Sequence, residues 1–172
     1  MTIIIRPARL LDADALPAIE QSAAALFRKD PSLAWLADAD VPDVLHHRHA
    51  IGTAHVWVAQ SADGPLIGFV SAIEIDNELH IQELSVAEGF QGQGAGRKLL
   101  LAALEHAGQR QLTAVTLTTF RDVSWNEPFY QRLGFQTLTG KQINPRLAAA
   151  LSNEIAYGLP AERRCAMRLQ LP

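Results

Sequence analysis

The fold of this chain is decided by the stretch Glu83-Leu-Ser-Val-Ala-Glu-Gly-Phe-Gln-Gly-Gln-Gly-Ala-Gly-Arg-Lys-Leu-Leu100. Its first part is apolar at Leu84 and Val86, which continues a hydrophobic run and predicts a strand. Its last part begins an apolar stripe that runs on with helical spacing to Ala107. The glycines between the strand and the helix allow positive φ angles and a close approach of another molecule to the main chain.

The glycine-rich turn precedes the helix directly, and this position favours the binding of an anion. Free N–H groups point out of a helix N-terminus, where the helix dipole is positive. Arg97 and Lys98 add positive charge at the same place. The turn therefore predicts a cradle for a phosphate or pyrophosphate, and the alternative is a surface turn that binds nothing.

Spacing separates three kinds of phosphate-binding turn. A P-loop requires Ser or Thr after its Gly-Lys pair, but here Arg97 follows Gly96 and Leu99 follows Lys98. A dinucleotide fingerprint requires G-x-x-G spacing after its first glycine pair and an acid about twenty residues later, and both are missing. The third pattern, Q/R-x-x-G-x-G/A, fits Gln91-Gly92-Gln93-Gly94-Ala95-Gly96 at every position. In this pattern the chain resembles the GCN5-related N-acetyltransferase (GNAT) family.

Composition and charge narrow the remaining possibilities. The chain has 172 residues, of which 48% are hydrophobic and 19% charged, as in a globular protein with its own core. No repeat or linker divides it, so we expect one domain over residues 1–172. The net charge of −3 without a basic block argues against nucleic acid as a partner. We find neither a signal peptide nor a membrane-spanning run, so we expect no membrane association.

A single cysteine, Cys165, excludes an internal disulfide and favours a reducing, cytoplasmic location. It lies in an alternating segment, where a small strand residue is a better interpretation than a catalytic thiol. His46, His47 and His49 suggest a metal site, but neighbouring residues on a helix point in different directions. We interpret them as a solvated helix face and expect no metal.

The remaining pattern gives the order of the elements. A strand at 2–7 precedes a helix capped by Asp12 or Asp14, a loop with a short helical turn at 28–43, and a helix at 43–54. Strands at 55–60, 66–75 and 79–86 form a meander, with turns at 61–64 and 76–77. After the turn and its helix, which ends before Gly108, we expect strands at 112–119, 135–139 and 163–171 and helices at 126–133 and 144–157. This order resembles the GNAT fold, an α/β (α+β) arrangement in which helices flank a mixed, mostly antiparallel sheet that splays at the acetyl-CoA site.

A second cluster supports the resemblance, Asn126-Glu-Pro-Phe-Tyr130-Gln-Arg-Leu-Gly134-Phe135. In the family, the corresponding Asn contacts the pantetheine arm and the Tyr lies beside the coenzyme sulfur. Asn126 also suits the N-cap of a helix, and both roles can hold together. Tyr130 is thereby implied as the acid that protonates the leaving thiolate.

The resemblance also implies a coenzyme site on the strand and the turn. The strand would pair its main chain with pantetheine, and an N–H near Leu84 would stabilise the oxyanion. The implied coenzyme-binding residues are Leu84, Ser85, Val86, Gln91, Gly92, Gln93, Gly94, Ala95, Gly96, Arg97 and Asn126.

The base that deprotonates the amine is one of two residues on this strand. Alternation places Glu83 and Ser85 on one face and His80 on the other. His80 falls where some family members carry their base, and Glu83 matches the acid that others place near the acceptor amine. We favour Glu83, with His80 as base or water relay, although a bulge would exchange the faces.

Two functions remain open at this point. The first is an acetyl-CoA-dependent N-acetyltransferase acting on a primary amine of a small molecule or peptide. The alternative is a non-catalytic acyl-CoA-binding or sensing module, because a fold and a coenzyme motif do not establish turnover. A homodimer is possible, as dimers are frequent in the family. The sequence does not identify the acceptor.

Overall fold

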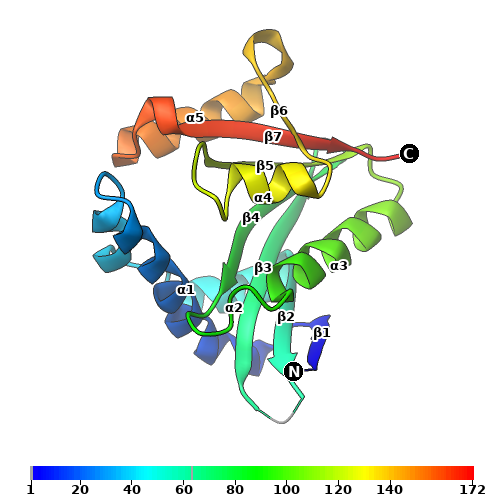
Figure 1. Cartoon of the computed structure of the whole chain (residues 1–172). Helices are drawn as coiled ribbons and strands as arrows, with labels where there is room; N and C mark the ends of the chain where they lie inside the picture. Colours follow the sequence, from blue (N-terminus) through cyan, green and yellow to red (C-terminus); the bar gives the residue numbers. More distant parts are fainter. Residues whose placement is uncertain (1, 63) are drawn as a thin grey trace. The chain divides into compact units, whose positions relative to one another are not determined.

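A computed structural model describes residues 2–62 and 64–172 and shows a mixed arrangement of strands and helices (Figure 1). The strands are β1 (Ile3–Pro7), β2 (His55–Ser61), β3 (Leu66–Ile75), β4 (Glu78–Val86), β5 (Ala114–Phe120), β6 (Gln136–Thr137) and β7 (Arg164–Gln170). The α-helices are α1 (Leu16–Ala24), α2 (Val44–Thr53), α3 (Ala95–Gln109), α4 (Glu127–Arg132) and α5 (Pro145–Tyr157). Short 3-10 segments are η1 (Leu10–Ala15), η2 (Ala25–Lys29), η3 (Ala34–Asp38), η4 (Gly140–Gln142) and η5 (Ala161–Arg163).

The strands form a seven-stranded sheet in the order β1-β2-β3-β4-β5-β7-β6. The β1–β2, β2–β3, β5–β7 and β6–β7 pairs are antiparallel, whereas β4 and β5 are parallel. Asp76 and Asn77 join β3 to β4 with φ angles of 54° and 61°, as a tight hairpin turn requires. The predicted mixed, mostly antiparallel sheet with flanking helices is confirmed.

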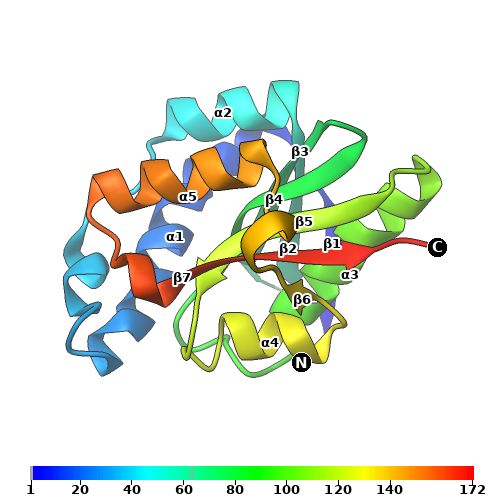
Figure 2. The ribbon, with the colours of Figure 1, turned by 90° about the horizontal axis from the view of Figure 1, so that it is seen from above.

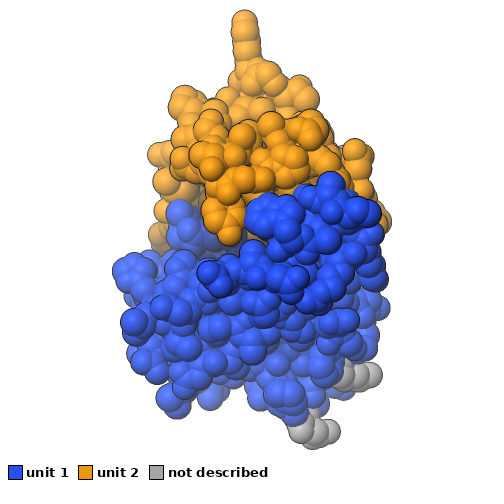
Figure 3. Space-filling model, turned by 90° about the vertical axis from the view of Figure 1, so that its left-hand side faces the viewer, with its two compact units in different colours: residues 1–73, 82–106 blue, residues 74–81, 107–172 orange. Residues whose placement is uncertain are grey.

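The chain divides into two compact units (Figure 3). The first comprises 1–73 and 82–106, and the second comprises 74–81 and 107–172. β3 and β4 contribute residues to both units. The prediction of a single domain therefore stays a prediction.

The first unit packs helices on both faces of β3. Phe69 joins a buried cluster with Leu16 and Ile19 of α1 and Ala50 of α2. Its neighbour Gly68 points the other way, and a Cβ added there would lie 3.3 Å from Leu99 of α3 and 2.8 Å from the carbonyl of Ser85. The alternation along one strand thus separates α1 and α2 from α3.

The second unit places α5 against β5 and β7 (Figure 2). Leu147 of α5 is fully buried and clusters with Leu138 and with Ala166 of β7. Asn144 begins α5 and accepts a hydrogen bond from the N–H of Leu147 at 2.8 Å. The helix ends before Gly158, whose φ of 127° suits glycine.

Three local expectations were wrong. Neither Asp12 nor Asp14 caps α1, whose N-cap is Ala15, because Asp12 instead pairs with Arg6 at 2.7 Å. Gly108 lies inside α3, which ends at Gln109. His47 is buried with 3% of its surface exposed, whereas His46 and His49 are exposed as expected. The predicted turn at 61–64 includes Asp63, which lies outside the described residues.

Candidate active site

The glycine-rich turn ends where α3 begins, at Ala95. Gly92 and Gly94 have φ angles of 76° and 91°, in the region that favours glycine. A Cβ built on either would meet no heavy atom within 4 Å in the described chain, so the space in front of both is open. The N–H of Lys98 bonds to the carbonyl of Gly94 at 3.0 Å, and the preceding N–H groups have no carbonyl one turn back in the helix. The turn therefore presents main-chain donors to open space.

Two glutamines hold the turn in this shape. The side-chain amide of Gln91 donates to the carbonyl of Val86 at 2.8 Å, which ties the turn to the end of β4. The Gln93 amide donates to the carbonyl of Gly89 at 3.3 Å. Ala95 is buried, whereas Arg97 is exposed at the start of the helix. The motif begins with Gln, and in this structure the Gln91 side chain fixes the turn to the end of β4.

Glu83 and Ser85 share a face of β4 in the first unit. The Ser85 hydroxyl donates to Oε1 of Glu83 at 2.9 Å, as strand alternation predicts. The parallel ladder between β4 and β5 consists of Glu78–Ala114, Leu79–Val115 and His80–Thr116 among the described residues, whereas β4 continues to Val86. The main chain of Leu84–Val86 therefore lies past the end of that ladder.

His80 lies in the second unit, within a network of charged side chains. Its Nδ1 lies 2.9 Å from Oγ1 of Thr116 and 3.1 Å from a guanidinium nitrogen of Arg146. A guanidinium only donates, so Nδ1 is the acceptor and a neutral His80 carries its proton on Nε2. Burial, together with the positive charge of Arg146, lowers the pKa of His80 from 6.5 to about 4. His80 is neutral at pH 7 and already protonated at Nε2.

The Arg146 side chain also bonds to Glu78, at 2.8 Å from Oε1, and Arg168 donates to the other oxygen of the same carboxylate. Glu78 is 5% exposed. A buried carboxylate between two guanidinium groups is fully paired, which fixes the position of Arg146 beside His80.

Asn126 and Tyr130 lie at α4 of the second unit. Asn126 occupies the N-cap position, yet its side chain makes no capping bond. Its Oδ1 is buried and has no hydrogen-bond partner in the described chain. Tyr130 is 7% exposed and packs edge-to-face on Phe129 and Phe135, with ring centroids 5.1 and 5.7 Å apart. Asn126 thus offers an acceptor that the protein itself does not use.

Two further residues of the first unit lie close to each other: Glu20, which the sequence did not single out, and His47, which it placed on a solvated helix face. Glu20 of α1 is 15% exposed in its side chain, and His47 Nε2 lies 3.4 Å from its Oε1. Burial, together with the negative charge of Glu83, raises the pKa of Glu20 from 4.5 to about 8. Burial lowers the pKa of His47, and His46 adds to this effect. In the sequence, Glu20 is an acidic residue among the apolar positions of a predicted helix. This pattern does not distinguish a buried carboxyl group from an exposed one.

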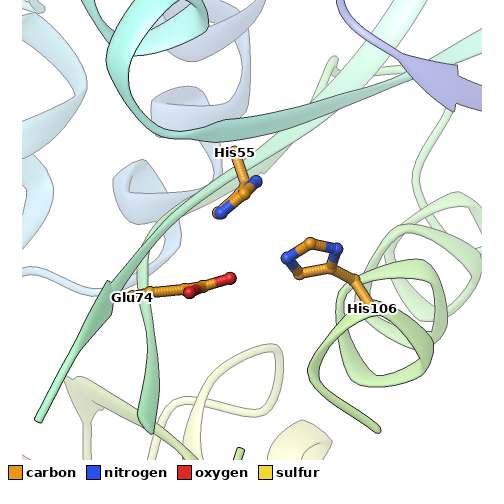
Figure 4. Close-up of side chains that lie close together, drawn as sticks. All are labelled: His55, Glu74 and His106. Atoms are coloured by element: carbon orange, nitrogen blue, oxygen red, sulfur yellow. The ribbon is translucent and has the colours of Figure 1, made fainter. Parts of the chain in front are cut away.

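Further titratable side chains lie elsewhere in the described part of the chain. Burial raises the pKa of the Cys165 thiol to about 12, and its Sγ donates to Glu127 at 3.7 Å. His55 and His106 of the first unit bring their rings together, with centroids 4.2 Å apart (Figure 4). Glu74, drawn with them, belongs to the second unit and bonds to Arg110 at 3.0 Å. The burial and the raised pKa of Cys165 make its thiol unsuited to nucleophilic catalysis.

The sequence matches the model of the acetyltransferase (GNAT) family over residues 19–135. The chain belongs to this family. The glycine turn, β4 and the Asn126–Tyr130 cluster all lie inside the matched region.

A probable N-acetyltransferase, camello, from Xenopus tropicalis is 35% identical over 83 residues. That segment covers 46% of this chain and 37% of the length of the relative. Two solved structures share the fold. The PaiA N-acetyltransferase of Thermoplasma acidophilum, in complex with coenzyme A, has a TM-score of 0.73 at 17% identity, over 99% of this chain and 100% of its own. The ribosomal-protein-S18-alanine N-acetyltransferase of Escherichia coli has a TM-score of 0.70 at 17% identity, over 98% of this chain and 94% of its own.

Among the described residues, every helix is too short or too polar to cross a bilayer.

Proposed function

We propose that this protein transfers the acetyl group of acetyl-CoA to a primary amine of a small molecule or peptide, by direct attack of the amine on the thioester. The observation that carries the proposal is the turn in which Gly92 and Gly94 open onto empty space at the start of α3. Its main-chain donors suit a pyrophosphate, and the chain belongs to the GNAT family.

The coenzyme would be held by main-chain groups more than by side chains. The N–H groups of Gly92–Arg97 would bind the pyrophosphate, and the main chain of Leu84–Val86 would pair with pantetheine like an added strand. Asn126 Oδ1 would accept from a pantetheine amide, which would satisfy its buried oxygen. Gln91 would act indirectly, by holding the turn to Val86.

The reaction requires proton transfers in both directions. An alkylammonium first loses a proton to a base, and its nitrogen then attacks the carbonyl carbon. The N–H near Leu84 would stabilise the oxyanion while the carbon–sulfur bond breaks. Tyr130 would protonate the leaving thiolate and recover its proton from the nitrogen, so the products are an amide, the free thiol and one released proton.

Glu83 is the better base of the two strand residues. His80 has its Nδ1 engaged by Arg146 and carries its proton on Nε2, so a neutral His80 offers no free lone pair. We assign the base to Glu83, and His80 becomes a donor from Nε2.

The names of the relatives concern transfer of acetyl groups to nitrogen, which supports this reaction class without fixing the acceptor. We place the protein in the cytoplasm, where its single thiol stays reduced. The reaction as proposed uses no metal.

Release of free thiol from acetyl-CoA tests the proposal. The protein is incubated with acetyl-CoA and a panel of alkylamines, polyamines, amino acids and short peptides. Amine-dependent thiol release well above the rate without amine is expected for at least one acceptor. A protein that binds acetyl-CoA but releases no thiol with any acceptor would be the sensing module instead.

A further inference from the structure

Three titratable side chains gather in the first unit, from three different elements. Glu20 comes from α1, His47 from α2 and Glu83 from β4. His47 stands edge-on to Phe69, with ring centroids 5.3 Å apart, and only 4% of its side chain is exposed. Its Nε2 lies 3.4 Å from Oε1 of Glu20 and forms no hydrogen bond in the described chain. The imidazole thus lies within ion-pair distance of the Glu20 carboxyl group without forming a hydrogen bond to it, which leaves that carboxyl group able to accept hydrogen bonds from a ligand.

The position of α1 explains why the charge of Glu83 affects the pKa of Glu20. Ser22, two residues after Glu20, accepts a hydrogen bond from the N–H of Glu88 at 2.8 Å, just beyond the end of β4. Leu16 and Ile19 anchor the same helix in the core. The helix therefore runs beside the last part of β4, where Glu83 lies.

We propose that Glu20 and Glu83 form one proton-accepting pair, which binds the acceptor amine as an ammonium cation and receives its proton, while His47 positions Glu20. The proposal rests on the acetyltransferase function proposed above. Two carboxyl groups in a partly buried site favour a cation, and they disfavour an acceptor that carries an anionic group next to its amine.

The chemistry of the pair suits proton transfer at neutral pH. Two interacting carboxyls titrate together, so one proton is retained by the pair near pH 7. A bound ammonium stabilises the second negative charge, and that proton leaves to solvent. The nitrogen then gives its proton to the pair, which takes it up more readily than an isolated carboxylate does, because the two negative charges repel each other once the ammonium charge is gone. The nitrogen lone pair is thereby freed for attack.

Other charged groups lie on the elements packed around this cluster. His46 and Asp43 of the α2 region act on the pKa of His47 in opposite directions. Six charged side chains of the same unit form ion pairs: Arg6 with Asp12, Arg48 with Asp14, and Arg28 with Asp38.

The first experiment does not depend on turnover. The pH titration of the carboxyl carbons is followed by NMR in the whole protein labelled with [δ-13C]glutamate. We expect a carboxyl that titrates near pH 8, disappears in Glu20→Gln and titrates lower in Glu83→Gln. In the wild-type protein, butylammonium should lower the pKa of this carboxyl, whereas butanol should leave that pKa unchanged. A Glu20 that titrates like an exposed glutamate, or that does not respond to butylammonium, would overturn the proposal.

The second experiment uses the best acceptor from the thiol-release panel. In Glu20→Gln we expect kcat/KM at pH 7 to fall on the order of a hundredfold, with a loss that shrinks as the pH approaches the pKa of the amine. Glu20→Asp should recover part of the activity, and Glu162→Gln, at an exposed position, should behave like wild type. Wild-type kcat/KM and pH profile in Glu20→Gln would overturn the pair.

The two experiments separate the two proposals. If no acceptor is acetylated but butylammonium shifts the Glu20 titration, the acetyltransferase function fails and the cation-binding pair stands. If acetylation proceeds and the titration shows no pair, the pair fails and the acetyltransferase function stands.

Discussion

The guanidinium of Arg146 donates a hydrogen bond to Nδ1 of His80, 3.1 Å away, and the Arg146 side chain is itself held by Glu78 at 2.8 Å. The positive partner and the burial together keep the imidazole neutral. The same contact fixes the proton on Nε2, which turns a histidine that sequence reasoning considers as a base into a donor.

A neutral, partly buried His80 makes the free energy of unfolding depend on pH in the acid range. Its folded pKa of about 4 lies below the ordinary value of 6.5, so the unfolded chain binds more protons between these values. Its contribution is present above pH 6.5 and is lost as the pH falls toward 4, by on the order of 2 kcal/mol. Urea unfolding at pH 7 and 4.5 should show this loss in wild type and a smaller loss in His80→Gln. Exposed His49, changed to Gln, serves as the control, and equal losses in all three proteins would refute the assignment.

Substitution of Asn126 distinguishes a role in capping α4 from a role in binding the coenzyme. Asn126→Ala removes an oxygen that bonds to nothing in the described chain, so the free energy of unfolding without coenzyme should hold or rise. The affinity for coenzyme A should weaken about tenfold. Asn144→Ala is the matched control, because Asn144 does cap α5 and its loss should cost about 1 kcal/mol. If Asn126→Ala loses stability like the control and binds coenzyme normally, Asn126 is only a cap.

The turn is tested with two glycines of similar backbone. Gly94 and Gly140 have φ angles of 91° and 52°, and both face open space. Alanine at either position should cost about 1–2 kcal/mol of stability. Coenzyme A at a hundred times its wild-type Kd should stabilise wild type and Gly140→Ala by about 2.7 kcal/mol in a thermal-shift assay. Gly94→Ala should lose most of that gain, and a full gain in this variant would move the pyrophosphate elsewhere.

Tyr130→Phe tests the acid. The ring stays packed on Phe129 and Phe135, and the hydroxyl alone is lost. We expect kcat to fall about a hundredfold, with the affinity for coenzyme A nearly unchanged. The measurement is single-turnover acetyl transfer, so that product release does not mask the chemical step. An unchanged rate would leave Tyr130 with a packing role.

The sequence predicted the parts of the fold that depend on local patterns. β3 spans Leu66–Ile75, the range predicted for the second strand of the meander, and α5 follows Asn144, whose side chain caps it. The glycine turn was recognised because its spacing has a backbone requirement, which the positive φ angles of Gly92 and Gly94 display. Asp12 was misjudged as a cap, since its ion pair with Arg6 depends on a contact that the local pattern does not contain.

The candidate site was only partly accessible from sequence for the same reason. Glu83 and His80 lie on a recognisable strand, but the partner that engages Nδ1 of His80 comes from α5, 66 residues away. Glu20 lies far from Glu83 in the chain, and burial, which raises its pKa, is a property of the packed core. His47 was interpreted, with His46 and His49, as part of a solvated helix face, but it is buried. The local sequence pattern contained no information on burial or on partners distant in the chain.

The central claim, transfer of an acetyl group to nitrogen, is tested most directly by mass spectrometry. Wild-type protein is given acetyl-CoA labelled with 13C in the acetyl group, together with the acceptor that releases most thiol. We predict one labelled acetyl group on the acceptor amine for each free thiol formed, and very little in Glu83→Gln at pH 7. Thiol release without labelled amide, or equal labelling in wild type, in Glu83→Gln and without protein, would contradict the claim.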